Sequence, residues 1–295
     1  TAVQGLSASE GAFQGALTYA KDRLAMRSLS GPKAPEKEAD PIIVHPAVRN
    51  MLLTQKAFAE GGRALVYLLC LHADIVERGA TEEDRKFSDN ILSLLTPIAK
   101  AYLTDTAFNA VIDSQMVFGG HGYIREWGME QCVRDLRIAQ IYEGTNGVQS
   151  QDLIGRKTIK CGGAFIADYI TEIRDFANSL DADLNFIKDA TLDAATEVEE
   201  VTKYILERAA ESAEFPNAAA VDYLHAVGLL SFAYMFARIA NAAKAKDGDF
   251  YQNKLALAAY FAQRILPEID LRIAKVKAGA EVIMNFSEDY FTSQA

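Results

Sequence analysis

Hydrophobic residues recur along most of the chain at spacings of three and four, the pattern of amphipathic α-helices. In the first segment this pattern predicts a helix that begins at Ser7 or Ser9 and ends at Arg27. Short β-branched segments with a period of two are missing, so no sheet is expected. The pattern therefore predicts an all-α fold built as a helical bundle. The stripe of the first segment consists of Phe13, Leu17, Ala20 and Leu24.

Proline, glycine and capping residues divide the first half into further helices. Pro46 suits a first helical turn and begins a predicted helix over 46–78. Thr81, followed by three acidic residues, is a typical N-cap for a helix that continues to Phe118, with a kink or break at Pro97. The glycine-rich segment 119–122 ends that helix.

A short helix is expected over 129–141, a sharp joint over 143–146, and another helix over 147–160. The Cys161-Gly162-Gly163 segment is the expected domain boundary. Beyond it, three or four helices are expected, with breaks near 181–183, 215–216 and 246–249. We therefore predict a bundle over residues 1–160 and an accessory acidic helical domain over 161–295.

Composition narrows the class of protein. The 295 residues are 50% hydrophobic and 24% charged, which excludes a disordered chain. The net charge of −10 is uneven, with −1 over residues 1–160 and −9 over residues 161–295. An acidic surface repels phosphate backbones, so we expect no nucleic-acid partner.

Three scattered cysteines without a CxxC pair indicate no disulfide framework, and four scattered histidines indicate no metal site. No apolar run is expected to reach the roughly 18 residues that cross a bilayer, so no membrane partner is expected. The first 25 residues lack the pattern of a signal peptide, and we expect a cytoplasmic protein. Thr1 in place of methionine suggests part of a longer polypeptide.

Glu143 is the candidate catalytic base. It lies between Tyr142 and Gly144 at a helix joint, where a side chain can project into a cleft. Removing a weakly acidic carbon-bound proton requires a carboxylate of this kind. The alternative is a surface glutamate stabilised by the dipole of the next helix, and spacing alone favours that alternative.

Four other residues are candidates for cofactor binding, each with a plainer alternative. Gly119 and Gly120 allow a ligand close to the backbone, or they form a helix C-cap and turn. Thr145 is either a ligand contact or only an N-cap. Arg23 offers a guanidinium fork to phosphate, or lies on a solvated helix face beside Arg27.

The motifs occur in a specific order: Tyr19-Ala20-Lys21-Asp22-Arg23, Gly119-Gly120-His121-Gly122-Tyr123, Arg134-Asp135, and Ile141-Tyr142-Glu143-Gly144-Thr145-Asn146. Over about residues 5–160 this order resembles the C-terminal helical domain of acyl-CoA dehydrogenases. The loop over 30–45 and the helices after residue 161 resemble the larger members of that family. Arg134 and Asp135 are expected to fix the helix before Glu143 through ion pairs.

The resemblance implies a role for each candidate. Glu143 matches the base that takes the α-proton of an acyl-CoA thioester while flavin N5 receives the β-hydride. Thr145 matches a flavin contact, Gly119 and Gly120 lie beside the adenine half of a neighbouring subunit's flavin, and Arg23 pairs with its pyrophosphate.

Other residues near these motifs are not assigned to the site. Met116 occupies the position where many relatives have glutamine, which puts a glutamine–cofactor contact in doubt. Tyr123 and Trp127 are expected to pack in the core, and His121 is given no role.

The resemblance also implies FAD, an acyl-CoA substrate, an electron-transfer flavoprotein as acceptor, and a homo-oligomer that is a dimer or a tetramer. The family's N-terminal helical and middle β-domains have no counterpart here, so we expect this chain alone to be inactive. Two alternatives remain: an acyl-CoA oxidase-like enzyme, and a non-catalytic helical binding or scaffold protein.

Overall fold

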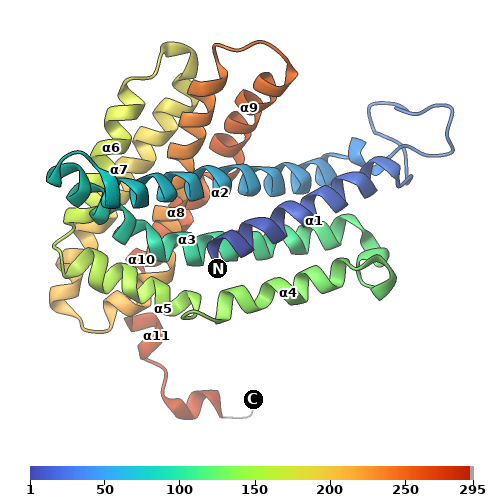
Figure 1. Cartoon of the computed structure of the whole chain (residues 1–295). Helices are drawn as coiled ribbons and strands as arrows, with labels where there is room; N and C mark the ends of the chain where they lie inside the picture. The colour runs from blue at the N-terminus through green and yellow to red at the C-terminus, as the bar shows by residue number, and fades with distance from the viewer. Residues whose placement is uncertain (293–295) are drawn as a thin grey trace.

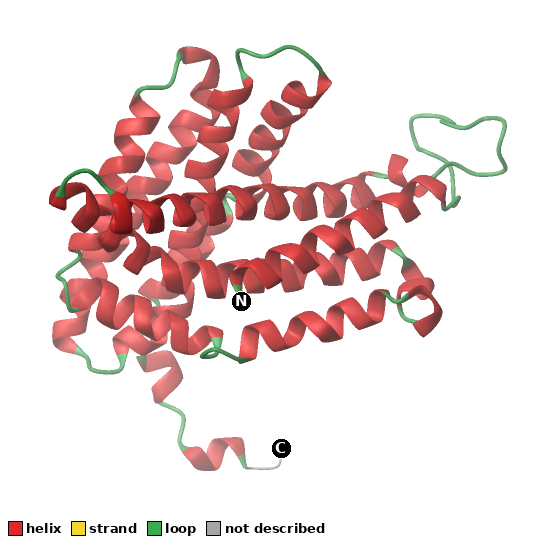
Figure 2. Ribbon diagram, viewed as in Figure 1, coloured by secondary structure: helices red, strands yellow, loops and turns green. Residues whose placement is uncertain are grey.

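The computed structural model describes residues 1–292, and that part of the chain is built from helices without a strand (Figure 2). An isolated antiparallel bridge joins Leu24 to Pro41. The predicted all-α class is confirmed. The α-helices are α1 Ala2–Asp22, α2 Pro46–Arg78, α3 Glu82–Val117, α4 Met129–Ile141, α5 Asn146–Gln151, α6 Ala164–Asn178, α7 Asn185–Glu211, α8 Phe215–Ala243, α9 Asp249–Tyr260, α10 Glu268–Lys277 and α11 Glu281–Met284.

Shorter segments join these helices. Two of them are π-helical and continue the helices before them: Asp152–Ile159 after α5 and Phe261–Ile265 after α9. Five are 3₁₀ turns: Ile42–Val44, Gly119–Gly122, Arg125–Trp127, Ala182–Leu184 and Glu288–Phe291. The glycine turn therefore ends α3 as predicted, and α4 has the predicted bounds.

Local capping chemistry explains where α2 and α3 begin. Pro46 occupies the first turn of α2, where a missing N–H costs nothing. Thr81 Oγ1 accepts a hydrogen bond from the Asp84 N–H at 3.0 Å, which confirms the predicted N-cap. Pro97 causes no break, because α3 runs through it without interruption.

The first helix differs from its prediction at both ends. It begins at Ala2 and ends at Asp22, and Arg23 has extended backbone angles of φ −65° and ψ 120°. The cause is a long-range pairing: the Ile42 N–H donates to the Arg23 carbonyl at 2.9 Å, next to the Leu24–Pro41 bridge. Arg27 therefore lies in a loop and is not a helical neighbour of Arg23.

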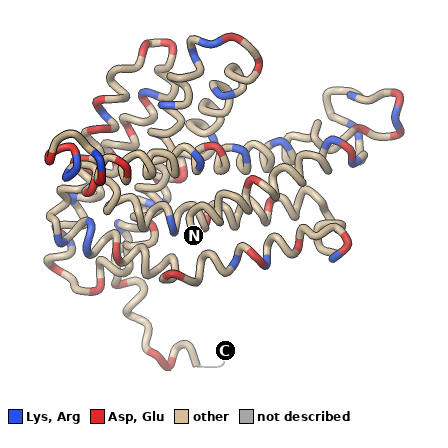
Figure 3. Tube along the Cα trace, in the orientation of Figure 1, with Lys and Arg blue, Asp and Glu red and all other residues tan. Residues whose placement is uncertain are grey.

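Beyond residue 163 the described chain has six α-helices, α6 to α11, rather than the predicted three or four. The breaks lie close to the predicted positions, at the 3₁₀ turn Ala182–Leu184, before Phe215 and before Asp249. Acidic residues recur along α6 and α7 (Figure 3).

Two hydrophobic clusters hold the helices together. The smaller one lies between α1, α3 and α4, with Leu52 of α2. The larger one joins α2 and α3 to α6, α7, α8, α9 and α10, and of these α6, α7 and α8 cross the long α2 steeply (Figure 1). Helices on both sides of residues 161–163 thus share one core, and the domain boundary there stays a prediction.

Helix α8 runs through the larger cluster. Contrary to the sequence expectation, it is long and apolar enough, by length and composition alone, to cross a membrane, with a mean hydropathy of 1.3 in its best window. In the structure 78% of that window is buried among the other helices, as in the core helix of a globular protein.

The crossing of α8 over α3 depends on a missing side chain. A Cβ atom at Gly228 of α8 would lie 2.4 Å from the ring of Tyr102, which is buried in α3. The same principle operates where α8 crosses α2, because a Cβ at Gly61 would lie 2.8 Å from the Phe232 ring. Glycine at these points allows the large aromatic rings to lie against the opposing backbone.

Replacing Gly228 by alanine should force these helices apart. We expect Gly228→Ala to lower the free energy of unfolding by about 1–3 kcal/mol, the usual cost of overpacking a core, as measured by urea unfolding. Gly11 of α1 is the control, because a Cβ there meets no atom within 4 Å. Gly11→Ala should raise the free energy of unfolding by about 0.5–1 kcal/mol through helix propensity. Equal stability of Gly228→Ala and the wild type would refute this account of the crossing.

Candidate functional site

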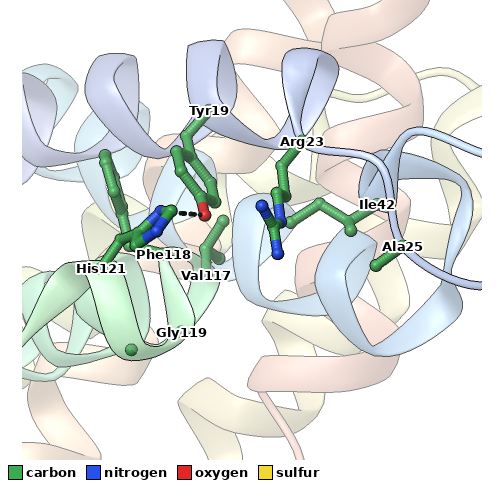
Figure 4. A pocket seen from close by; sticks show the side chains of 9 residues that line it. Tyr19, Arg23, Ala25, Ile42, Val117, Phe118, Gly119 and His121 are labelled. Carbon is green, nitrogen blue, oxygen red and sulfur yellow. Dashed lines mark hydrogen bonds between the residues drawn. The ribbon is translucent and has the colours of Figure 1, made fainter.

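A cavity of about 380 Å³ lies between the end of α1 and the turn after α3 (Figure 4). The structure brings Arg23, Gly119 and Gly120, three of the residues considered as cofactor-binding candidates, together in its lining. The remaining lining residues are Tyr19, Ala25, Ile42, Val117, Phe118 and His121.

Aromatic stacking shapes one wall of this cavity. The Tyr19 ring stacks on Phe118 with 4.3 Å between ring centroids, and its hydroxyl hydrogen-bonds to His121 Nδ1 at 2.9 Å. His121 stacks in turn on Trp127 at 4.6 Å. His121, which sequence analysis gave no role, therefore fixes the wall together with Tyr19. Tyr123 is 80% exposed, so its predicted core packing is wrong.

The polar side of the cavity suits an anionic group. The exposed Arg23 guanidinium makes no hydrogen bond or ion pair with any residue from 1 to 292. Gly119 has a positive φ of 58°, and a Cβ at Gly119 or Gly120 would meet no atom within 4 Å. An unpaired guanidinium fork beside open backbone is the arrangement that phosphate oxygens require. The residues present therefore fit the diphosphate of a dinucleotide.

Gln115, next to Met116, stabilises the glycine turn after α3. Gln115 Nε2 donates to the Gly122 carbonyl at 3.0 Å, which fixes the glycine turn against the end of α3. Met116, at the position where many relatives have glutamine, is 65% exposed.

Asp40 organises the loop that follows Arg23. Its buried carboxylate accepts hydrogen bonds from the N–H groups of Ser28, Lys33 and Ala34 at 2.7–2.8 Å, and from Arg27 at 3.3 Å. These hydrogen bonds, with the Ser28 N–H first, lower the pKa of Asp40 to about 2. Arg27 also donates to the carbonyls of Ala34 and Lys37, so the loop closes on itself.

Glu143 occupies a sharp turn between α4 and α5. Its φ is +57° and that of Gly144 is +76°, so a non-glycine residue holds the left-handed conformation. The Glu143 carbonyl accepts from Gln149 Nε2 at 2.9 Å, and Thr145 Oγ1 accepts from the Val148 N–H at 3.3 Å. Thr145 is therefore the N-cap of α5, a role that is compatible with a ligand contact.

The turn exposes the Glu143 side chain on the surface of the chain. A hollow of about 430 Å³ lies along α5 and the π-helical segment after it, lined by Val148, Gln149, Gln151, Asp152 and Arg156. On its inner side the turn rests on a polar network that includes Lys100, a buried residue the sequence analysis missed. No local sequence motif identifies Lys100 as part of the site, because its side chain bonds to residues more than forty positions away.

The two groups of candidates do not meet within one chain. Arg23, Gly119 and Gly120 lie before α4 and Glu143 and Thr145 lie after it. With 13 residues, α4 separates them by roughly 20 Å at 1.5 Å per residue.

The α4 helix itself corrects one expectation. Arg134 and Asp135 form no ion pair within residues 1–292; Asp135 instead accepts from Gln131 Nε2 at 2.5 Å. Across the same residues, no group of three or more His, Cys, Asp or Glu side chains is arranged to hold a metal ion.

Fold and site together define a helical domain of the acyl-CoA dehydrogenase type. The family model described as "Acyl-CoA dehydrogenase, C-terminal domain" matches residues 1–158, and a second, described as "Acetyl-CoA dehydrogenase C-terminal like", matches residues 169–287. The chain belongs to the acyl-CoA dehydrogenase family. Its similarity extends to 3-methylmercaptopropionyl-CoA dehydrogenase of Ruegeria pomeroyi, which is 32% identical over 97% of this chain and 49% of that protein. The branch of larger members expected from the sequence is thereby confirmed.

Solved structures share the fold. ACDH-11 of Caenorhabditis elegans, solved in complex with C11-CoA, matches with a TM-score of 0.75 at 20% identity, over 97% of this chain and 46% of that one. Acyl-CoA oxidase3 of Yarrowia lipolytica matches with a TM-score of 0.68 at 16% identity, over 94% and 46%. The chain spans about half the length of the curated relatives it matches over most of its own length.

Asp40 should control the order of the loop beside the cavity. We expect Asp40→Asn to speed tryptic cleavage after Lys33 and Lys37 about tenfold, because the neutral amide loses charge-assisted hydrogen bonds. Time-resolved proteolysis of the native chain measures this, with Glu38→Gln, an exposed carboxylate of the same loop, as control. Since the folded pKa is lowered, the stabilisation should be complete above about pH 4 and lost as the pH falls toward 2. Unchanged cleavage in Asp40→Asn would overturn this role.

Proposed function

We propose that this chain is the C-terminal part of a flavin-dependent acyl-CoA dehydrogenase that desaturates the α,β bond of an acyl-CoA thioester. The observation that supports this most is Glu143, an exposed carboxylate held at positive φ in the turn between α4 and α5. A carboxylate presented from a turn whose backbone holds an uncommon conformation is an arrangement expected of a general base.

In the proposed reaction the Glu143 carboxylate takes the α-proton of the thioester. The electron pair of the broken α C–H bond forms the new carbon–carbon double bond as the β-hydrogen leaves with its own electron pair. FAD, which enzymes of this family bind, supplies the acceptor for that hydride. The chain's part is to hold Glu143 in position, and Thr145 of the same turn would contact the flavin.

Arg23, Gly119 and Gly120 are proposed to hold the diphosphate of FAD. The guanidinium donates to the phosphate oxygens, and the two glycines leave the backbone open to them. Because α4 separates this cavity from Glu143, we propose that the two groups serve different FAD molecules in a homo-oligomer.

Substrate, acceptor and location belong to the same proposal. Acyl-CoA is the substrate, an electron-transfer flavoprotein accepts the electrons, and the enzyme is cytoplasmic without a membrane or nucleic-acid partner. The relatives' additional half would supply the rest of the FAD and acyl-CoA sites, so the 295-residue chain alone is proposed to be inactive.

An acyl-CoA oxidase is the second candidate, because the fold is shared with the yeast oxidase. Turnover with oxygen would release hydrogen peroxide, whereas a dehydrogenase would reduce an acceptor dye and little oxygen. A binding or scaffold protein without chemistry is disfavoured, because such a protein needs neither Glu143 at positive φ nor an unpaired Arg23 beside open glycines.

Glu143→Gln tests the catalytic proposal in a full-length polypeptide that contains this chain. We expect acyl-CoA-dependent dye reduction to fall by about 10²–10⁴-fold, the range for loss of a general base, while the flavin absorbance spectrum is unchanged. The control is Glu126→Gln, a surface glutamate in the 3₁₀ turn before α4, which should keep full activity. Dye reduction by Glu143→Gln at the wild-type rate would refute the proposed role.

Arg23→Ala tests the cofactor proposal through binding rather than turnover. We expect the dissociation constant of FAD to rise about 10–100-fold, because a charge-assisted hydrogen bond to phosphate is lost. Titration of the full-length apoprotein with FAD, followed by flavin fluorescence, measures this. Arg134→Ala removes another exposed arginine, in α4, and should leave the constant within about twofold. An unchanged constant in Arg23→Ala would place the diphosphate elsewhere.

A further inference from the structure

A buried lysine supports the Glu143 turn from below. Lys100 of α3 is 7% exposed, and its Nζ donates to the Gly144 carbonyl at 2.8 Å and to Asn146 Oδ1 at 2.7 Å. Burial lowers the pKa of Lys100, whereas the negative charges of Asp105 and Glu143 raise it. The ammonium group is thus fastened to the residue after Glu143 and to the first residue of α5.

Asn146 links this lysine to a carboxylate. Its Nδ2 donates to Asp105 Oδ1 at 2.6 Å, to Thr104 Oγ1 at 3.0 Å and to the Ala101 carbonyl at 3.2 Å. Its Oδ1 accepts from Lys100, so both ends of the amide are bound to α3. These hydrogen bonds hold the start of α5 in place against α3.

Asp105 ties down the other side of the turn as well. The same Oδ1 accepts from Gln140 Nε2 at 2.6 Å, in the last turn of α4. Gln140 and Asn146 flank Glu143 on its two sides, so one carboxylate holds both ends of the segment that carries the proposed base.

The second half of the chain completes the arrangement. His225 Nε2 of α8 lies 3.0 Å from Asp105 Oδ2, and the histidine ring packs edge-on against Tyr102 with 5.5 Å between ring centroids. His225 is 9% exposed and lies 120 positions from Asp105. The polar network therefore runs from the Glu143 turn through α3 to a helix of the accessory region.

We propose that Asp105 and His225 are positioning residues for Glu143. Asn146 and Lys100 connect Asp105 to the turn that carries Glu143. The proposal rests on Glu143 being the base of the proposed function. The turn needs such contacts because Glu143 has a positive φ, and this backbone conformation persists only where surrounding contacts hold it. In this way α8, a helix of the accessory region, takes part in the placement of the proposed base through Asp105.

The competing explanation is a polar cluster that stabilises the fold generally and has no special effect on the turn. The two explanations differ in where the structure loosens when the network is cut. If the network positions Glu143, the segment 143–149 should open while the rest of α8 and α3 stays closed. If it serves only stability, every amide should exchange faster together through global unfolding.

Amide hydrogen exchange on the 295-residue chain tests this without FAD or substrate. We expect His225→Leu to speed exchange over residues 143–149 about tenfold or more, because the hydrogen bond to a charged group is lost. His225→Gln, which retains a donor for Asp105, should restore slow exchange to within about twofold. The control is Tyr223→Phe, which removes another buried α8 hydrogen bond, the 2.9 Å contact with Thr202, away from the turn.

Exchange over 143–149 that stays slow in His225→Leu, or that rises equally in Tyr223→Phe, overturns the positioning role. If His225→Leu does not fold, as judged by circular dichroism, Lys100→Met is measured in its place, with the same result expected. In the full-length enzyme, His225→Leu should lower kcat about tenfold or more with KM changed less than about threefold, since substrate contacts are intact. An active Glu143→Gln enzyme would refute the proposed function, while the exchange result would still report on the turn.

Discussion

The Asp105 carboxylate is the group around which the candidate catalytic half of the molecule is arranged. A partly buried carboxylate is costly unless hydrogen-bond donors surround it. Here the donors come from the end of α4, the start of α5 and the middle of α8, and together they lower the pKa of Asp105 against the effect of burial. Removing any of the three helices would take away one of these donors, so a single carboxylate links all three helices to α3.

The same segment of α3 both packs against α8 and contacts the Glu143 turn, because successive residues of a helix point in different directions. Tyr102 faces α8 and requires the missing Cβ of Gly228, whereas Lys100 and Asp105 face the Glu143 turn. Dense packing around Tyr102 therefore holds α3 and α8 at the separation that the Asp105–His225 contact needs. Stability of the core and geometry of the site are consequences of one helix crossing.

Local signals explain what the sequence predicted well. The start of α2 at Pro46, the cap at Thr81 and the stop at Gly119 each follow from the chemistry of one or two residues. The end of α1 was wrong because pairing with residues near Pro41 fixes it, and the network under Glu143 was missed because His225 is 120 positions from Asp105. The motif residues were found, but neither spacing nor periodicity reveals which of them share a cavity.

The exposed position of Glu143 indicates which groups the proposed reaction would need from other parts of the enzyme. Its carboxylate is exposed, and a carboxylate in water is well solvated and has little drive to take a carbon-bound proton. The turn supplies position, through Asp105, but no apolar wall over the carboxylate. At the other end of α4, the Arg23 cavity has a charge and open backbone without a reacting group. Each end thus supplies what the other lacks, and in the proposed function a second chain, together with the relatives' additional half, brings both kinds of group to one flavin.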